Sequence, residues 1–302
     1  MNKINPSLIY LVAAAVIWGA TVPIMKITLR EVPLFTLIVL RMTVASTLLL
    51  PFVYKRLKEV KRSDFKLLFL AALFGTNLNL AFFFYGLERS EAINGSVILA
   101  TTPIITLVFA HIYLKEKFTK KLVAGMSLAL LGVITIIGIP VIDFNFKSTI
   151  GNLSLLASAL AWVGHEIFSK KALKKYHFTL VAFYTTFIGA TVFFPLMLME
   201  YVHNPTWYQN VSTTGWLGLA YGMIFASFIG YTTWQKGLAG TSATTASFVF
   251  YLLPITGIIF SVILLKELFS PMLIVGTILV ALGITLAEFH RKSKPLQKEL
   301  HD

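Results

Sequence analysis

Two stretches of the chain, PIITLVFAHIYLKEKF at residues 103–118 and PITGIIFSVILLKELF at residues 254–269, show the same pattern 151 residues apart. Each is an apolar run that begins at a proline and ends near a Leu-Lys-Glu triplet. The alignment extends without a gap from Gly86–Thr135 onto Gly237–Leu286, with 17 identities in 50 positions. Shared apolar composition would not align proline, glycine and a Lys-Glu pair together, so the pattern indicates an internal repeat.

The composition indicates that the chain folds in a membrane. Hydrophobic residues make up 57% of it and charged residues only 13%, the reverse of what a water-exposed surface needs. Apolar runs long enough to cross about 30 Å of hydrocarbon recur along the whole sequence. They predict an all-α integral membrane protein with ten transmembrane helices near residues 6–29, 34–54, 64–86, 92–114, 121–139, 149–170, 178–201, 213–235, 241–265 and 271–290.

The basic residues predict the orientation of these helices. Alternate connections, together with both termini, hold twenty of the 26 lysines and arginines, whereas the other connections hold five and Arg41 falls inside the second span. By the positive-inside rule, the N- and C-termini are both expected on the cytoplasmic side of the membrane. The net charge of +13 is therefore a topology signal, and no nucleic-acid partner is expected.

The repeat covers both halves of the chain. At a shift of 144, Leu11–Arg30 aligns with Leu155–Lys174, and Trp18 meets Trp162. Since each copy holds five spans, an odd number, the second copy must enter the membrane from the opposite side. We therefore expect two inverted-topology repeats around a central cavity, at residues 1–140 and 148–290, followed by a cytoplasmic tail at 291–302.

The sequence resembles the drug/metabolite transporter superfamily, and specifically chains with two EamA-type domains. The residues that carry the resemblance are Trp18-Gly19 with Lys26, Arg41, Tyr85-Gly86-Leu87, Pro103, Leu114-Lys115-Glu116-Lys117, Gly125 and Gly132, and in the second copy Trp162, Gly237-Leu238, Pro254, Leu265-Lys266-Glu267, Gly276 and Gly283. The resemblance implies ten helices, a cavity open to alternate sides, and movement of amino acids or other small metabolites, often outward.

The expected function is secondary transport of a small metabolite, with export of amino acids or their derivatives favoured. Proton-coupled multidrug efflux is one alternative, and a membrane assembly factor or receptor that does not transport is another. The chain has no cysteine, no His-Glu-x-x-His motif, since residue 169 is serine, and no nucleophile elbow or P-loop. We therefore expect neither an enzyme nor a cofactor or metal, while substrate, coupling ion and oligomeric state remain open.

Three ionisable residues inside the spans are candidates for function. Arg41 could bind an anionic group or act in gating, or it could snorkel or form a structural hydrogen bond. His165 and Glu166 could load and release a proton. The alternative for Glu166 is a local ion pair with Lys170, four residues further along the helix.

Polar and aromatic residues complete the candidate cavity. Asparagine side chains in hydrocarbon need partners, which could be a substrate or a neighbouring helix. Asn77 and Asn79 diverge by about 200° on a regular helix, so they are not both expected to reach the cavity. The full set of cavity candidates is Trp18, Thr21, Arg41, Asn77, Asn79, Asn94, Trp162, His165, Tyr231, Gln235 and Tyr251.

Prolines and glycines predict bends and close contacts. Pro103 and Pro254 interrupt the helical hydrogen-bond ladder and are candidates for gating or for a static kink. Gly125 and Gly132, like Gly276 and Gly283, are seven residues apart and so lie on one helix face. Such faces permit close approach of backbones, which predicts helix packing or a dimer surface rather than cavity walls, with packing within the chain favoured.

Overall fold

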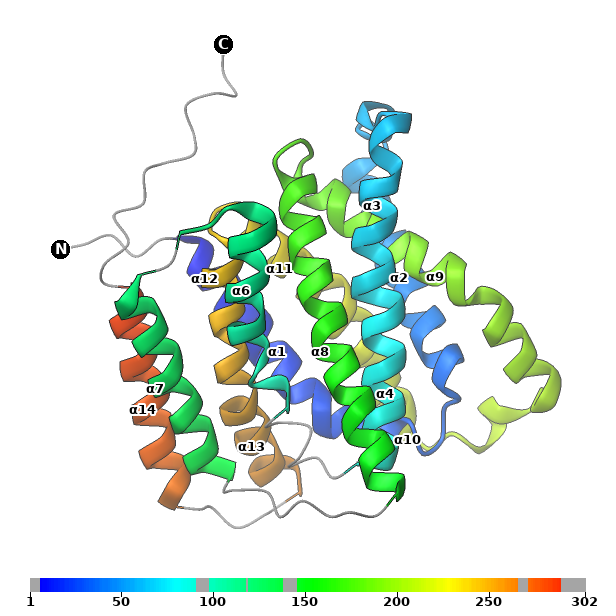
Figure 1. The fold of residues 1–302 in the computed structure, drawn as a ribbon. Helices are drawn as coiled ribbons and strands as arrows, with labels where there is room; N and C mark the ends of the chain where they lie inside the picture. Colours follow the sequence, from blue (N-terminus) through cyan, green and yellow to red (C-terminus); the bar gives the residue numbers. More distant parts are fainter. Residues whose placement is uncertain (1–5, 91–97, 118, 138–145, 266–270, 289–302) are drawn as a thin grey trace.

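The computed structural model describes residues 6–90, 98–117, 119–137, 146–265 and 271–288, and within these ranges the chain is helical and contains no strand (Figure 1). The α-helices are α1 (Pro6–Thr28), α2 (Leu34–Val53), α3 (Phe65–Ala72), α4 (Asn79–Arg89), α6 (Thr102–Leu114), α7 (Lys120–Ile137), α8 (Phe146–Leu173), α9 (Phe178–His203), α10 (Thr213–Tyr221), α11 (Gly230–Ala239), α12 (Ala243–Ser247), α13 (Leu252–Leu265) and α14 (Pro271–Glu288).

The helices form a bundle whose outer surface suits lipid. Five helical stretches among the described residues are long and apolar enough to cross a membrane: Pro6–Thr28, Leu34–Val53, Arg62–Arg89, Phe178–His203 and Thr213–Ala239. Shorter apolar helices cover Ile98–Leu114, Ala243–Gly257 and Ile274–Leu286. Large apolar side chains lie exposed on these helices, among them Leu131, Leu153, Phe187, Phe194, Leu217 and Ile278. Exposed apolar side chains in such number would aggregate in water, and they identify lipid as the solvent.

Two of the long stretches contain a wide helical turn that the sequence did not predict. A π-helical segment, Leu73–Leu78, joins α3 to α4, and a second one, Gly222–Ile229, joins α10 to α11. At the repeat shift of 151, the first segment falls on residues 224–229, inside the second. Such turns leave backbone carbonyls displaced from the ladder and are frequent at functional sites.

The repeat-related prolines lie at helix starts. Pro103 is in the first turn of α6, after the non-helical Ala100 and Thr101. Pro254 is the third residue of α13, which follows a 3₁₀ segment at Phe248–Tyr251. A proline lacks the N–H that a helix interior needs, so both helices change geometry on the N-terminal side of the proline.

Polar contacts between the described helices define two ends of the bundle. At the end that we call the basic end, Lys171 lies over the ring of Tyr113 and Lys175 pairs with Asp64 at 2.6 Å, joining the ends of α6, α8 and α3. At the end that we call the opposite end, Glu31 accepts hydrogen bonds from Ser212, and Glu200 accepts from Thr36.

Helices α7 and α14 lie side by side at one flank of the bundle (Figure 1). A methyl group on Gly132 would lie 2.7 Å from the Gly276 carbonyl, and one on Gly283 would lie 2.6 Å from the Gly125 carbonyl. The two helices run antiparallel, because Gly132 meets Gly276 while the earlier Gly125 meets the later Gly283. All four glycines therefore lie in one tight contact within the chain.

Candidate functional site at the centre of the bundle

Four helical segments bring aromatic rings together at the centre of the bundle. Trp18 of α1 contacts Trp162 of α8 edge to face, with 5.2 Å between ring centroids. Trp18 also packs against Tyr231 and Trp234 of α11, at 5.7 and 5.5 Å. Phe250 closes the group against Trp162 at 5.3 Å. Each such pair adds roughly 1 kcal/mol beyond its buried area, so these rings form a rigid wall. We call these five residues the aromatic cluster.

Glycines on the π-helical stretches make room for this cluster. A methyl group on Gly75 would lie 2.1 Å from Nδ1 of His165, and one on Gly230 would lie 2.6 Å from the indole nitrogen of Trp18. The same indole N–H donates to the carbonyl of Ala226, at 3.0 Å, within the second π-helical segment. The widened turns and their glycines therefore position the rings.

His165 belongs to a buried polar group beside the rings. Its ring lies 4.9 Å from that of Trp162, and its Nδ1 is 2.8 Å from the Ala71 carbonyl, which makes Nδ1 the donor. Nε2 is left to face the side-chain amide of Gln235 at 3.3 Å, and that amide also donates to Ser169 at 3.2 Å. His165, Ser169 and Gln235 are fully buried.

Glu166 is a fully buried carboxylate with no cation partner among the described residues. Its Oε2 accepts a hydrogen bond from the Thr106 hydroxyl at 2.5 Å, while its Oε1 has no partner. Trp162 is close by, although its indole N–H does not reach hydrogen-bond geometry. Lys170 does not pair with Glu166. Its ammonium donates instead to backbone carbonyls at the end of α11, so the ion-pair interpretation does not hold in this conformation.

Arg41 is a buried guanidinium held by neutral groups. Its Nε donates to Ser227 Oγ at 3.1 Å and lies 3.3 Å from the Gly222 carbonyl, both in the second π-helical segment. The guanidinium also lies 3.7 Å from the Met25 sulfur and 5.5 Å from the centre of the Phe84 ring. No carboxylate among the described residues is within 4 Å of it. Since a buried cation normally has a counter-ion, this one is suited to receive an anion.

Unsatisfied polar atoms gather on the same helices. Within the described residues, seven buried side-chain atoms lack a hydrogen-bond partner, and four of them belong to Trp162, Glu166, Trp234 and Gln235; the others are on Asn77, Thr102 and Tyr251. Native structures rarely leave such atoms unpaired, and clusters of them mark places where water or a ligand binds. The centre of the bundle therefore has free polar atoms that can hydrogen-bond a polar ligand or water.

The other predicted cavity residues lie elsewhere. Asn77 donates to the Gly189 carbonyl of α9, and Asn79 donates to Ser158 of α8, so each side chain joins a different pair of helices. Thr21 bonds its own helix at the Ile17 carbonyl. Tyr251 is buried against Phe248, in the core beside α7 and α14, and Asn94 lies outside the described residues.

Several residues at the centre of the bundle were not among the candidates predicted from the sequence. Trp234 and Phe250 complete the aromatic cluster, Thr106 binds Glu166, and Ser227 binds Arg41. Trp234 could have been found, because Tyr231, Trp234 and Gln235 have the i, i+3, i+4 spacing of one helix face. The two hydroxyls carry no comparable signal, since threonine and serine are common in apolar helices.

A cavity of about 490 Å³ opens at the opposite end, between α1 and α4. It is lined by Lys26, Leu29, Arg30, Leu87, Glu88, Arg89 and Ser90. Met25 and Phe84, which Arg41 contacts, lie within one helical turn of Lys26 and Leu87. Arg41 is therefore close to the inner end of this basic cavity.

An all-helical bundle with an apolar outer surface and ionisable groups buried at its centre defines a multi-pass membrane protein. The chain belongs to the EamA-like transporter family, which residues 5–138 and 149–289 match. It is a transporter of this family, within the drug/metabolite transporter superfamily.

Several curated relatives are named transporters. The uncharacterized transporter YyaM of Bacillus subtilis is 28% identical over 217 residues, covering 71% of this chain and 69% of the relative. An uncharacterized transporter of Archaeoglobus fulgidus is 27% identical, covering 89% and 93%. A probable terminal-alkyne amino-acid exporter of Streptantibioticus cattleyicolor is 24% identical, covering 94% of each chain. A solved crystal structure shares the fold, with a TM-score of 0.77 and 16% identity over 95% of this chain and 98% of the other.

Proposed function

We propose that the chain is a secondary transporter of small carboxylate-bearing metabolites, with amino acids or their derivatives favoured, and that it works by alternating access and favours export. It would use ten transmembrane helices in two inverted repeats, in a plasma membrane, with both termini in the cytoplasm. The relative named as a probable amino-acid exporter supports this substrate class. The observation that carries the proposal is the buried Arg41 guanidinium, which has no carboxylate partner among the described residues.

The surroundings of Arg41 fit a carboxylate better than a neutral solute. A guanidinium offers a planar fork of donors that matches two carboxylate oxygens. In the structure, oxygen acceptors occupy only Nε, and Nη1 donates to the Met25 sulfur, a weak acceptor, so the terminal nitrogens keep donors for a carboxylate. The aromatic cluster and the amide of Gln235 lie on the α8 and α11 side, where they would contact the rest of the substrate.

The test is uptake into proteoliposomes from a panel of labelled amino acids, their amides and other metabolites. If Arg41 binds the carboxylate, Arg41→Lys, which keeps the charge but loses the fork, should raise KM by about tenfold or more, since a lost charge-assisted hydrogen bond is worth about 1.5–3 kcal/mol. Amides of the transported acids should not compete. Arg62→Lys, at an exposed position outside the cavity, is the matched control. Unchanged competition by amides would contradict carboxylate recognition.

Proton coupling is a second candidate, and Glu166 is the observation that favours it. A buried carboxyl group that meets a hydroxyl donor but no cation can exist in either protonation state as its surroundings change. Protonation at one side of the membrane and release at the other would couple transport to the pH gradient. His165 could relay the proton, because it directly precedes Glu166 on α8 and its Nε2, which accepts from the Gln235 amide, could take up a proton instead.

Glu166→Gln tests this coupling, because glutamine keeps the shape and an oxygen that Thr106 can bond. An imposed pH gradient should drive substrate accumulation by the unchanged protein and not by this variant, while exchange of internal for external substrate continues. Gradient-driven accumulation that survives the substitution would exclude Glu166 as the coupling group.

A further inference from the structure

Lys170 closes the basic end of the bundle. From the last turns of α8, its ammonium donates to the carbonyls of Leu238 at 2.7 Å, Ala239 at 3.2 Å and Thr241. The carbonyls of Leu238 and Ala239 end α11 and that of Thr241 follows it, at the helix end that presents negative charge to a cation. Lys170 thereby fastens α8 to α11 at this end.

Glu116 strengthens the same closure from the other half of the chain. Its carboxylate accepts from the backbone N–H groups of Ala243, at 2.8 Å, and Thr244, at 3.2 Å, and from the Thr244 hydroxyl. The short connection between α11 and α12 thus has a cation on the helix end before it and a carboxylate on the helix start after it. Both charges suit the helix dipoles, so the basic end is closed by interactions that favour one another.

The internal repeat assigns a counterpart to each partner of Lys170. Lys170 corresponds to Lys26 at the shift of 144, and Leu238, Ala239 and Thr241 correspond to Leu87, Glu88 and Ser90 at the shift of 151. Lys26 and these three residues line the cavity of about 490 Å³ at the opposite end. Lys26 makes no hydrogen bond or ion pair that the structure describes, although its counterpart donates to the three carbonyls named above. Space therefore separates the lysine from its acceptors at one end, while contact joins them at the other.

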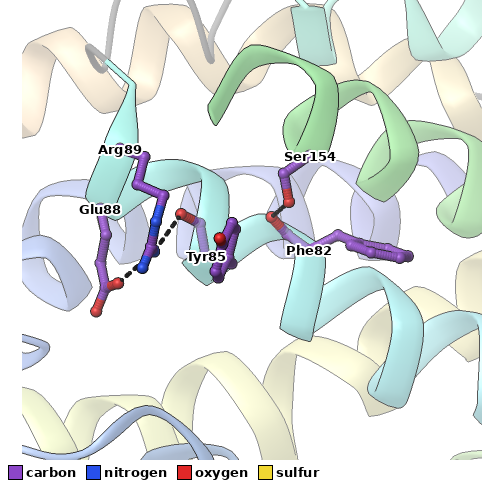
Figure 2. A network of polar contacts seen from close by, with 5 residues as sticks. All are labelled: Phe82, Tyr85, Glu88, Arg89 and Ser154. Atoms are coloured by element: carbon purple, nitrogen blue, oxygen red, sulfur yellow. Dashed lines mark hydrogen bonds and ion pairs between the residues drawn. The ribbon is translucent and has the colours of Figure 1, made fainter. Parts of the chain in front are cut away.

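Arg89, another basic residue of the cavity, does not replace Lys26 in this role. Figure 2 shows that the Arg89 guanidinium is already bound within α4, to Glu88 at 2.8 Å and to the Tyr85 carbonyl at 3.2 Å. Its guanidinium also lies 3.6 Å from the centre of the Tyr85 ring. The neighbouring turn of α4 is held to α8 where Ser154 donates to the Phe82 carbonyl at 2.8 Å (Figure 2). The end of α4 is therefore a fixed surface toward which Lys26 can move.

We propose that Lys26 and Lys170 are a repeat-related pair of gating residues, each of which closes one end of the transport pathway by capping the helix end opposite it. The structure is the state in which Lys170 is engaged and the opposite end is open. In the alternate state, Lys26 donates to the carbonyls of Leu87, Glu88 and Ser90, and Lys170 is released. This inference rests on transport by alternating access, and it adds the residues that hold each state.

The experiment uses cysteine accessibility, because the chain contains no cysteine of its own. Glu88→Cys and Ala239→Cys place single thiols at repeat-related, exposed positions beside the two gates. The labelling rate with a membrane-impermeant maleimide is measured from each side of the membrane, in right-side-out and inside-out vesicles. Each reporter is combined with Lys26→Met, Lys170→Met or the control Lys174→Met, which removes an exposed lysine near the same end as Lys170.

Lys170→Met should speed labelling of Ala239→Cys and slow labelling of Glu88→Cys, each by about tenfold, because losing several charge-assisted hydrogen bonds shifts a two-state equilibrium by that order. Lys26→Met should do the reverse, and Lys174→Met should change neither rate. Lys170→Arg should restore the pattern of the unchanged protein, since arginine can also cap the carbonyls.

Two results would overturn the gate. Both reporters could respond in the same direction to either lysine variant, which would indicate loosening of the fold, or neither could respond in a variant that elutes as a single species. The labelling requires no substrate, so opposite shifts without uptake of any compound would count against the proposed substrate class and leave the gate intact. Uptake that depends on Arg41, found without opposite changes in the two labelling rates, would support the substrate class and count against the gate.

Discussion

Gly75 leaves no room for a methyl group beside His165, which makes this glycine a sensitive point at the scale of single residues. A Cβ there would lie 2.1 Å from His165 Nδ1, so the ring would have to move and give up its contact with the Ala71 carbonyl. We expect Gly75→Ala to cost about 1–3 kcal/mol, the usual range for overpacking a core. The midpoint of thermal unfolding in detergent measures this loss.

Gly257→Ala is the control for that prediction. A Cβ on Gly257 would lie 3.5 Å from its nearest neighbour, the Gly19 carbonyl, which is an ordinary contact. This variant should unfold at or above the temperature of the unchanged protein, because alanine favours a helix over glycine. Equal midpoints for the two variants would mean that His165 has room to move.

Contact partners could be predicted from the sequence more readily for residues that are the same in both copies of the repeat than for residues that differ between the copies. Trp18 and Trp162 were paired by the alignment, and the structure brings their rings together. Glu166 has Val22 at its counterpart position, and Arg41 lies outside both aligned stretches, so the repeat says nothing about their partners. Those partners, Ser227 and Thr106, lie 186 and 60 residues away and depend on how whole helices pack.

At the scale of elements, two helix starts are capped in the same way by distant glutamates. Glu200 accepts from the N–H groups of Phe35 and Thr36 and from the Thr36 hydroxyl, as Glu116 does with Ala243, Thr244 and the Thr244 hydroxyl. Each carboxylate satisfies backbone donors that the helix cannot satisfy itself. The glutamates therefore fasten α9 to α2 and the end of α6 to α12.

Replacing Glu200 by glutamine tests the strength of this cap. Glutamine keeps one acceptor oxygen but loses the charge and the second oxygen, so we expect a loss of about 1–2 kcal/mol in unfolding free energy. Glu59→Gln, at an exposed position, should change the thermal midpoint little. A Glu200→Gln midpoint matching that of Glu59→Gln would show that water replaces the carboxylate.

The contact between α7 and α14 depends on glycines, which lack a side chain. Gly132→Val should separate the helices, because the Gly276 carbonyl lies only 2.7 Å from the position of its Cβ. We expect about 2–3 kcal/mol of destabilisation and a lower yield of monodisperse protein in size-exclusion chromatography. Leu131→Val, which changes the neighbouring exposed side chain, should behave like the unchanged protein.

The sequence predicted where helices occur better than it predicted their local geometry. Apolar length and glycine spacing predicted the long helices and the faces of α7 and α14. The π-helical segments could not be predicted, because their residues, Leu73–Leu78 and Gly222–Ile229, carry no proline and belong to the same continuous helical stretches as their neighbours. Their wide turns are stabilised by side chains from other helices, including Trp18 and Arg41.

At the scale of the whole molecule, the orientation can be tested with two single cysteines. Lys58→Cys lies in the connection after α2, and Thr206→Cys lies in the connection after α9. If the basic end faces the cytoplasm, an impermeant maleimide added to intact cells should label Thr206→Cys and leave Lys58→Cys unlabelled until the membrane is opened. The opposite pattern would invert the orientation, and with it the sides assigned to the two gates.

The contact between α7 and α14 also bears on how such a chain can originate. Gly132 meets Gly276 as Gly283 meets Gly125, so each helix offers its partner the same surface that it receives. A self-complementary interface of this kind is the one that two identical subunits form about a twofold axis. A shorter gene encoding only one copy of the repeat, whose product inserted into the bilayer in both directions, would already possess both sides of this interface. Fusion of two copies removes the need for separate subunits to associate. It also allows each copy to acquire different charged residues at the centre of the bundle.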